Sequence, residues 1–522
     1  MKIKDKLIYF IEYSWLFILL LFASLVYTNQ KMISLFFNSD GVASVLLFKD
    51  LLIEHGHYKD WAIPSVTHFF PGMPIFALVF LTVKNIYLYF LTVIWVTIIA
   101  MYFAIKLIYS QYFPTRKSTF CALMVITGMF LLAFTGRPPY NILLLAFYHV
   151  EEFIAGLFLL GIQINLVNKD KLTYKDYILV AFSTLIAFGC SLSDLLFFVQ
   201  FASPIFFTYS LFFLTKRISF FRYLLFSSPI ILSSIAGLFT LECFIANYSL
   251  SNYLSHPSLA KISFSTISAQ SIVLLKTFKT SSNYFVRVIY SIFYSTLILT
   301  IGARIFTKNK ENIKNSIKKM SFLILFIFLS IFFTIGSIFC LTDVNYVIDR
   351  YMFPLFYFPF LFFFIPIAYL NSKLLNSKIF LYFTAAVFLY TIITLLAYTN
   401  RSNFKIHMSY YPQYVRCIDK SLRGYGHNGI AQYWDANLIT ALSLENVKVV
   451  PVINSLYTFP WLININKFKD PVNFIIIDMP DKDYNPFILD ENLVYSLYGT
   501  PKKIVICKKK KILIYSRVIK LR

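Results

Sequence analysis

The chain has 522 residues, of which 58% are hydrophobic and only 14% are charged, and it contains 59 Phe and 37 Tyr. An ordinary soluble domain carries about 25% charged residues, so this composition excludes one. The net charge of +24 would suggest a nucleic-acid partner in a soluble protein. Much of the Lys and Arg here stands in short loops between apolar runs, where it signals membrane topology. We therefore predict a polytopic membrane protein and expect no nucleic-acid partner.

The predicted membrane spans are eleven apolar runs of suitable length, because a helix needs about 17–25 residues to cross a bilayer core of about 30 Å. The first run follows MKIKDK and shows no small-residue cleavage site, so we expect an uncleaved anchor and a cytoplasmic N-terminus. The runs are 7–28, 86–110, 118–135, 150–167, 177–193, 195–214, 223–245, 285–303, 320–341, 351–370 and 379–399. They predict a transmembrane domain over 1–399 and a soluble α/β domain over 400–522.

The segment 73–83 decides the orientation of the chain. It is apolar but too short to cross a bilayer without tilt or thinning, so we interpret it as a re-entrant or interfacial helix. Residues 29–85 then form one long external loop, and the tail from 400 onward is also external. On this reading the basic residues of the short loops face the cytoplasm, as in Arg116/Lys117 and Lys216/Arg217. We expect a multi-pass protein of the plasma (inner) membrane with a periplasmic tail.

The stretch LFFNSDGVASVLLFKD, residues 35–50, places Asp40 at the start of a helix in this external loop. Ser39 or Asp40 is suited to cap the helix, which we expect to run along the membrane surface to about Glu54. Asp is among the best N-cap residues, so capping alone is one explanation of Asp40. The other explanation is that the carboxylate takes part in chemistry at the water–membrane boundary.

The order of these elements resembles the GT-C superfamily of membrane glycosyltransferases. The features that carry the resemblance are a first span, an external loop with an early acidic residue, surface helices, a W…P…FFPxxP-like passage, many further spans and an external C-terminal domain. The resemblance implies an inverting transfer of a sugar from a polyprenyl-phosphate carrier to a lipid, glycan or protein acceptor. Asp40 would be the general base on the non-cytoplasmic face. Many members have a second acidic residue directly afterwards, whereas Gly41 and Val42 follow here.

The segment FYHVEEF contributes His149, Glu151 and Glu152 at the external start of the fourth predicted span. The resemblance implies a second acidic residue between the third and fourth spans, so Glu151 and Glu152 are predicted catalytic residues and His149 a substrate-binding residue. Ionisable groups at this depth are expensive unless they face a cavity or water. The alternative is that the two carboxylates only complement the dipole of the helix that follows.

Three further segments supply predicted substrate-binding residues. DVNYVIDRYMFP contains Arg350 and Tyr351, a pair that the resemblance implies, and Arg is suited to a phosphate. The alternative for Arg350 is snorkelling at the membrane interface. Asp194, in the outer turn between spans five and six, is expected either to line the same cavity or to bind local backbone groups. Lys49 is expected near a lipid phosphate, although surface lysines are common.

No cofactor is expected and no residue is assigned to a metal. Glu54, His55, His57 and His68 form no specific metal-ligand pattern, and binding of a divalent cation is kept only as an alternative. Two other functions remain as alternatives, a flippase or transporter of a lipid-linked saccharide and a non-catalytic assembly protein. The candidate groups gather near helix ends on one face, whereas a transporter needs them near the midplane, which favours an interfacial active site.

The composition of the tail differs from that of the apolar spans, and its pattern of residues predicts a small α/β fold. Its strands are expected at 447–453, 473–479, 503–507 and 512–516, the last two as a hairpin with a lysine-rich turn, and its helices at 412–424 and 434–444. Trp434 and Asp435 are candidate sugar or acceptor contacts, although packing explains an aromatic residue on a helix more often. Cys417 and Cys507 are a candidate disulfide if the tail is external.

Overall fold

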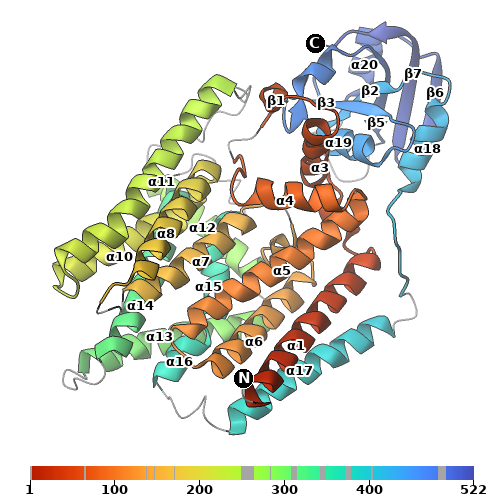
Figure 1. Ribbon diagram of the computed structural model, residues 1–522. Helices are drawn as coiled ribbons and strands as arrows, with labels where there is room; N and C mark the ends of the chain where they lie inside the picture. The colour runs from red at the N-terminus through yellow and green to blue at the C-terminus, as the bar shows by residue number, and fades with distance from the viewer. Residues whose placement is uncertain are drawn as a thin grey trace.

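The computed structural model describes residues 3–63, 66–136, 138–145, 147–167, 169, 171–248, 264–281, 284–306, 314–340, 349–370, 378–400, 404–479 and 489–521. Long helices form a bundle, and a small α/β unit built from the tail lies against one end of it, while the N-terminus lies at the opposite end (Figure 1). The predicted class, a polytopic helical membrane protein with a small C-terminal sheet, is confirmed.

Nine helices in the described part of the chain are long and apolar enough to cross a membrane. They lie in α1 (Ile3–Thr28), α5 (Ile86–Ser110), α6 (Thr115–Ala133), α8 (Tyr174–Ser193), the continuous run of α9 (Leu195–Phe197), η3 (Phe198–Ala202) and α10 (Ser203–Leu214), α11 (Phe220–Tyr248), α13 (Tyr284–Phe306), α14 (Lys314–Phe339) and α17 (Lys378–Thr399). The pair α15 (Phe353–Leu361) and α16 (Phe364–Leu370), bent by 48°, makes a tenth candidate.

All eleven predicted runs coincide with helices, and two of them differ from a simple span. The run 150–167 is α7 (Val150–Leu166), which has 17 residues, and the run 351–370 is the bent pair. The long helix α12 (Phe264–Ser281) was not predicted, because Ser, Thr, Gln and Lys interrupt its apolar residues.

The external loop folds into short elements that precede α5. These are α2 (Ile33–Phe36), α3 (Ser39–Leu52), η1 (Tyr58–Asp60), β1 (Trp61–Ala62) and α4 (Gly72–Thr82). The expected surface helix is therefore present but ends at Leu52, and the short apolar segment is the 11-residue helix α4. The expected cap is wrong: the N-cap of α3 is Asn38, whose side chain accepts a hydrogen bond from the Gly41 amide at 2.9 Å. Capping therefore does not explain Asp40.

The tail forms a five-stranded sheet in the order β3-β2-β5-β7-β6. The elements are α18 (Gln413–Leu422), β2 (Asn428–Gln432), α19 (Tyr433–Leu442), β3 (Lys448–Val452), β5 (Val472–Asp478), α20 (Glu491–Tyr498), β6 (Lys503–Cys507) and β7 (Lys510–Ile519). Strands β2, β3 and β5 are parallel, whereas β6 and β7 form the predicted antiparallel hairpin. The sequence did not predict β2, whose only large apolar residue is Ile430, or α20.

A disulfide between Cys417 and Cys507 joins α18 to the edge strand β6, with the two Cα atoms 5.6 Å apart. The candidate pairing is confirmed. Because it connects the first helix of the tail to one of its last strands, it closes the fold of the tail on itself.

The tail is docked onto the external loop rather than hanging from α17. Strand β1 pairs antiparallel with β4 (Ile463–Asn464), so that loop and tail share a two-stranded sheet. The Asp50 carboxylate accepts hydrogen bonds from the Trp61 indole at 2.5 Å and from the Asn464 amide at 3.0 Å. Helix α3 also packs against α19 (Figure 1). This docking brings the tail to the start of α3, where Asp40 lies.

Candidate active site

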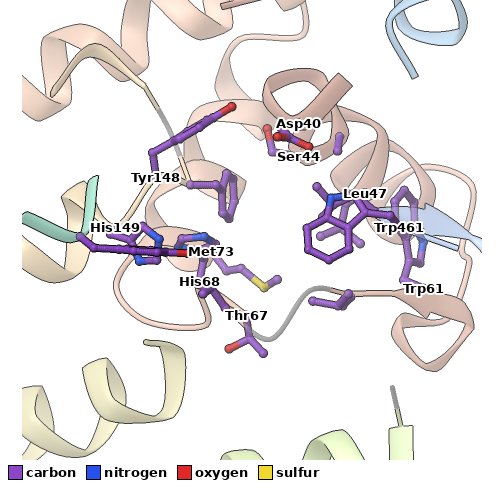
Figure 2. Close-up of a pocket in the computed structure, with 16 residues that line it drawn as sticks. Asp40, Ser44, Leu47, Trp61, Thr67, His68, Met73, Tyr148, His149 and Trp461 are labelled. Atoms are coloured by element: carbon purple, nitrogen blue, oxygen red, sulfur yellow. The ribbon is translucent and has the colours of Figure 1, made fainter. Parts of the chain in front are cut away.

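A small cavity of about 170 Å³ lies where the external loop, the helix bundle and the tail meet (Figure 2). Its walls come from segments that are far apart in the sequence. They include Asp40, Ser44 and Leu47 of α3, Trp61, His68 and Met73 of the rest of the loop, Tyr148 and His149 before α7, Tyr351 before α15, and Trp461 of the tail. Three of the predicted site residues, Asp40, His149 and Tyr351, therefore reach one cavity.

Asp40 is partly buried at this cavity and contacts the tail. The Tyr433 hydroxyl donates a hydrogen bond to Asp40 Oδ1, and the Ser39 hydroxyl donates to the Tyr433 carbonyl. Burial, with the Asp40 charge beside it, raises the pKa of the Tyr433 hydroxyl well above its ordinary value, so Tyr433 remains a donor. Asp40 thus has a fixed orientation and no role as a cap, and its carboxylate lines the cavity as a general base would.

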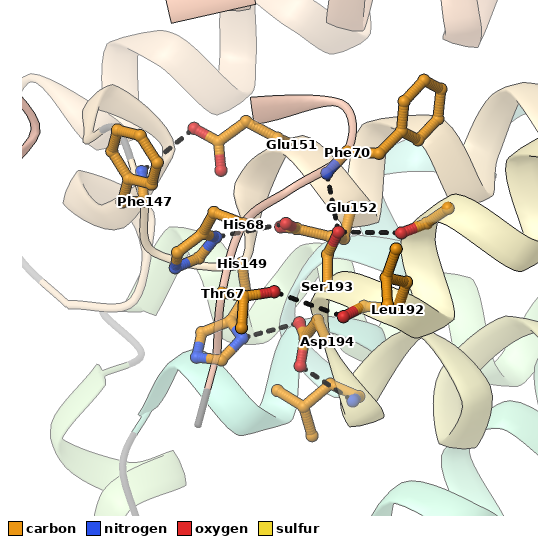
Figure 3. A network of polar contacts seen from close by, with 12 residues as sticks. Thr67, His68, Phe70, Phe147, His149, Glu151, Glu152, Leu192, Ser193 and Asp194 are labelled. Carbon is orange, nitrogen blue, oxygen red and sulfur yellow. Dashed lines mark hydrogen bonds and ion pairs between the residues drawn. The ribbon is translucent and has the colours of Figure 1, made fainter. Parts of the chain in front are cut away.

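Glu151 and Glu152 begin α7 behind this cavity and are both buried (Figure 3). Glu152 Oε1 lies 3.1 Å from His68 Nδ1, and Glu151 Oε1 accepts the Phe147 amide at 3.2 Å. The second oxygen of each carboxylate is buried and has no hydrogen-bond partner among the described residues. A helix dipole explains acidic residues in a first turn, but it does not explain two buried oxygens without partners.

The side chains of His68, Glu151 and Glu152 could together hold a metal ion. One ligand atom from each lies within 4.8 Å of the others, and all three residues are buried. Imidazole nitrogen with carboxylate oxygen suits Zn²⁺ or Mn²⁺, and the two partnerless oxygens fit such an ion. Of the four residues weighed from the sequence as metal ligands, only His68 belongs to this group, because His55 and His57 are exposed beyond α3.

His149 and Asp194 form a second buried pair at the same end of the bundle. His149 Nδ1 lies 2.6 Å from Asp194 Oδ2, and the other Asp194 oxygen accepts the Leu196 amide at 2.9 Å (Figure 3). Asp194 therefore caps α9 and supports His149 but does not itself line the cavity. Its contact with Nδ1 leaves Nε2 of His149 for a group in the cavity.

The remaining predicted residues lie as follows. Tyr351 is 5.7 Å from His149 between ring centroids, and its carbonyl accepts a hydrogen bond from Gln200 at 3.0 Å. Arg350 falls in η7 (Asp349–Met352), but its side chain lies outside the described residues, so its role stays a prediction. Lys49 forms a half-exposed ion pair with Glu54 at 3.2 Å and is not a cavity residue.

The sequence did not identify Tyr433 or Trp461 as residues of the site, and it indicated His68 only as one of four unspecific metal-ligand candidates. Tyr433 directly precedes Trp434 and Asp435, which were the candidates in that segment, yet Trp434 is 42% exposed and Asp435 pairs with Lys510 at 2.6 Å. The helical phase of α19 turns Tyr433, and not Trp434, toward α3. Trp461 lies in a loop of the tail, where no pattern marks it.

No protein-family model and no curated protein matches the sequence. Two solved structures from Archaeoglobus fulgidus are similar. The oligosaccharyltransferase in complex with Zn and sulfate is 10% identical with a TM-score of 0.43, and the match covers 81% of this chain and 60% of that one. The oligosaccharyltransferase AglB with an inhibitory peptide and a dolichol-phosphate is 11% identical with a TM-score of 0.46, over 90% of this chain and 69% of that one.

Both similar proteins are membrane glycosyltransferases of the GT-C type, the superfamily that the order of elements in this chain resembles. The chain spans 60% and 69% of their lengths. Because both TM-scores are below 0.5, the functional case rests on the residues of the cavity.

Proposed function

We propose that the protein is an inverting membrane glycosyltransferase that moves a sugar from a polyprenyl-phosphate carrier to a hydroxyl group of a lipid, glycan or protein acceptor. The observation that carries the proposal is the meeting of Asp40, His68 and His149 on one cavity at the end of the helix bundle. A carrier whose chain stays in the bilayer presents its phosphate and sugar at this level. A polar acceptor reaches the same level from the aqueous side.

Asp40 is the proposed general base. It takes the proton of the acceptor hydroxyl while that oxygen forms a bond to the anomeric carbon of the donor sugar. The bond between the anomeric carbon and the carrier phosphate breaks, and its electron pair leaves with the phosphate. Tyr433 holds the Asp40 carboxylate in place through its hydrogen bond, so the tail takes part in positioning the base.

The leaving phosphate belongs at the opposite end of the cavity, where His68 and His149 lie (Figure 2). Asp194 accepts from Nδ1 of His149 and orients the ring, and in its protonated form the imidazolium donates from Nε2 to a phosphate oxygen. His68, Glu151 and Glu152 would hold a divalent cation beside them, and such a cation supplies positive charge for the departing phosphate.

Two observations support a non-cytoplasmic position of this site. The Cys417–Cys507 disulfide belongs to the tail that covers the cavity, and disulfides persist in oxidising compartments. Arg116 and Lys117 stand in the first turn of α6, at the end of the bundle away from the tail (Figure 1), as the positive-inside rule expects for the cytoplasmic side.

A flippase or transporter of a lipid-linked saccharide is the second candidate. Its substrate path would require ionisable groups near the middle of the bundle. The groups described above, in contrast, begin helices at one end of it, as Glu151 and Glu152 do in α7. In a non-catalytic assembly protein Asp40 would only hold the tail through Tyr433, since Asn38 already caps the helix, and Asp40→Asn would then leave the glycans unchanged.

The decisive experiment replaces Asp40 by Asn and compares the glycans and lipid-linked sugars of the host by mass spectrometry. Asn keeps an oxygen for the Tyr433 hydroxyl but cannot take a proton, so we expect transfer to fall by at least about 100-fold. One glycan should lose a single sugar while the charged carrier accumulates. Asp60→Asn, in the same loop but outside the cavity, is the matched control. Unchanged glycans at normal expression of Asp40→Asn would exclude Asp40 as the base.

A further inference from the structure

We infer that the cavity is a subsite for a single sugar ring of the donor, and that Trp461 of the tail is the aromatic wall on which this ring stacks. The inference rests on the proposed function and adds the class of donor to it, a monosaccharide carried on a polyprenyl phosphate. It also gives the tail a second task besides holding Asp40.

The volume of the cavity fits one ring. About 170 Å³ is a small ligand space, on the order of one sugar ring with its hydroxyl groups. Pockets that enclose drug-sized ligands have about 300–1,000 Å³. The described walls therefore leave room for about one ring, and a second sugar would have to lie outside them.

The ring in this space must be that of the donor. In an inverting displacement the acceptor oxygen attacks the anomeric carbon from the side opposite the leaving phosphate. The base and the groups that receive the phosphate therefore lie on opposite sides of the donor ring. In Figure 2, Asp40 and Ser44 lie at one end of the cavity, His68 and His149 lie at another, and Trp461 forms the wall across from the two histidines.

The side wall has the chemistry that a sugar ring requires. A sugar ring presents a face of C–H groups that packs on an aromatic face, while its hydroxyl groups point outward to polar partners. Trp461 and Leu47 form the apolar side, together with Met73, whereas the ends of the cavity are polar. Trp461 is only partly buried, so part of its ring surface stays open to a ligand.

Trp461 is held in a fixed position relative to Asp40. Its ring stacks on Phe459 with centroids 6.4 Å apart and an interplanar angle of 20°. Its side chain is hydrogen-bonded to Tyr433, whose hydroxyl donates to Asp40. The aromatic wall and the base are thus connected through one tyrosine, and a ring stacked on Trp461 has a defined distance to the base.

The test measures binding of short-chain prenyl phosphates to the purified full-length protein. The probes are a C10 prenyl phosphate that carries one hexose and the same lipid that carries a hexose disaccharide. We expect saturable binding of the first and at least about ten-fold weaker binding of the second. Trp461→Leu should weaken binding of the monosaccharide probe by about ten-fold, the equivalent of about 1.4 kcal/mol. Trp461→Phe keeps an aromatic face and should lose less.

The matched control is Tyr457→Leu, which removes an aromatic side chain that is 53% exposed on the same segment of the tail and outside the cavity. It should bind like the wild type. Equal binding by Trp461→Leu and Tyr457→Leu, equal binding of the two probes, or no binding of the monosaccharide probe by the wild type would each overturn the inference. Binding is independent of transfer, so a failed Asp40→Asn test with intact probe binding would reject the glycosyltransferase while leaving the subsite.

Discussion

The acidic residues at the end of the helix bundle and those of the tail are held by different partners. In the tail, Lys510 contacts Asp435 at 2.6 Å and also Asp478, and Lys511 contacts Glu491 at 2.8 Å. In the bundle, Glu152 lies against His68 and Asp194 against His149, both histidines.

We interpret this difference as one between carboxylates that stabilise the fold, in the tail, and carboxylates that belong to a binding or catalytic site, in the bundle. A lysine ammonium is a permanent counter-charge, so a carboxylate beside it needs no ligand. A histidine carries charge only when protonated, and Glu151 and Glu152 each keep a buried oxygen without a hydrogen-bond partner among the described residues. Such a cluster is incomplete until a cation, a proton or a substrate group joins it.

The largest effect that would test this comparison is expected for Glu152→Gln. The amide keeps the shape of the side chain but removes one proposed ligand oxygen, so bound divalent metal should be lost and transfer should fall by about 100-fold or more. The temperature of unfolding should change little, because the amide oxygen of Gln can still accept a hydrogen bond from His68. Metal analysis of the purified protein and the glycan assay measure the two quantities. Wild-type metal content and transfer in this variant would reject the cation site.

The opposite result is expected for Asp435→Asn in the tail. It removes one of two carboxylates around the largely buried Lys510, so we expect a loss of about 1–3 kcal/mol in the free energy of unfolding. Transfer and metal content per folded molecule should stay at the wild-type level. Thermal unfolding of the full chain measures the loss. A fall in metal content or transfer without destabilisation would place Asp435 among the residues of the site and break the comparison.

Tyr433 stands between the two regions, and Tyr433→Phe should therefore have a smaller effect on both. The variant loses the hydroxyl that donates to Asp40 but keeps the ring that packs against Phe459. We expect transfer to fall by about ten-fold with a loss of stability of about 1 kcal/mol, because one hydrogen bond to a carboxylate is removed. The initial rate of transfer at saturating donor is the readout. Tyr433→Leu, which also removes the ring, should destabilise the tail further, and equal transfer by wild type and Tyr433→Phe would remove the tail from the catalytic arrangement.

Much of the fold could be predicted from the sequence, because membrane spans follow from long apolar runs alone. The same reasoning placed Asp40, Glu151 and Glu152 at one face of the membrane. It could not find that Asn38 caps α3, because Asn, Ser and Asp in sequence are all good caps and only geometry selects among them.

The parts of the site that could not be predicted come from contacts between distant segments. Nothing local marks Trp461, and Tyr433 reaches Asp40 only because β1 pairs with β4 and so sets the tail against α3. His68 was weighed with the neighbouring His55 and His57, whereas its partners come from α7, more than eighty residues away in the chain. Sequence spacing reports such partners only when they share one helix or one strand.

The smallest expected effect concerns Glu491, whose pKa is lowered by hydrogen bonds from Lys511 and Tyr495. A carboxyl group with a lower pKa in the folded state stabilises the fold above its unfolded pKa, near 4.5, and loses this contribution as the pH falls through the folded value. The pair is partly exposed, so the contribution is at most about 1 kcal/mol.

Glu491→Gln should therefore lower the temperature of unfolding slightly near neutral pH, and this difference should shrink at an acidic pH well below 4.5, as Glu491 of the wild type takes up its proton. The measurement is the difference between wild type and variant at the two pH values, with Glu445→Gln, which loses an exposed pair with Arg423, as the control for surface charge. Transfer should be unchanged in both variants. A difference that is equal at both pH values would mean that packing, and not the Lys511 pair, holds Glu491. A loss of transfer would mean that Glu491 also contributes to the active site, and it would contradict the idea that the lysine-paired carboxylates of the tail only stabilise the fold.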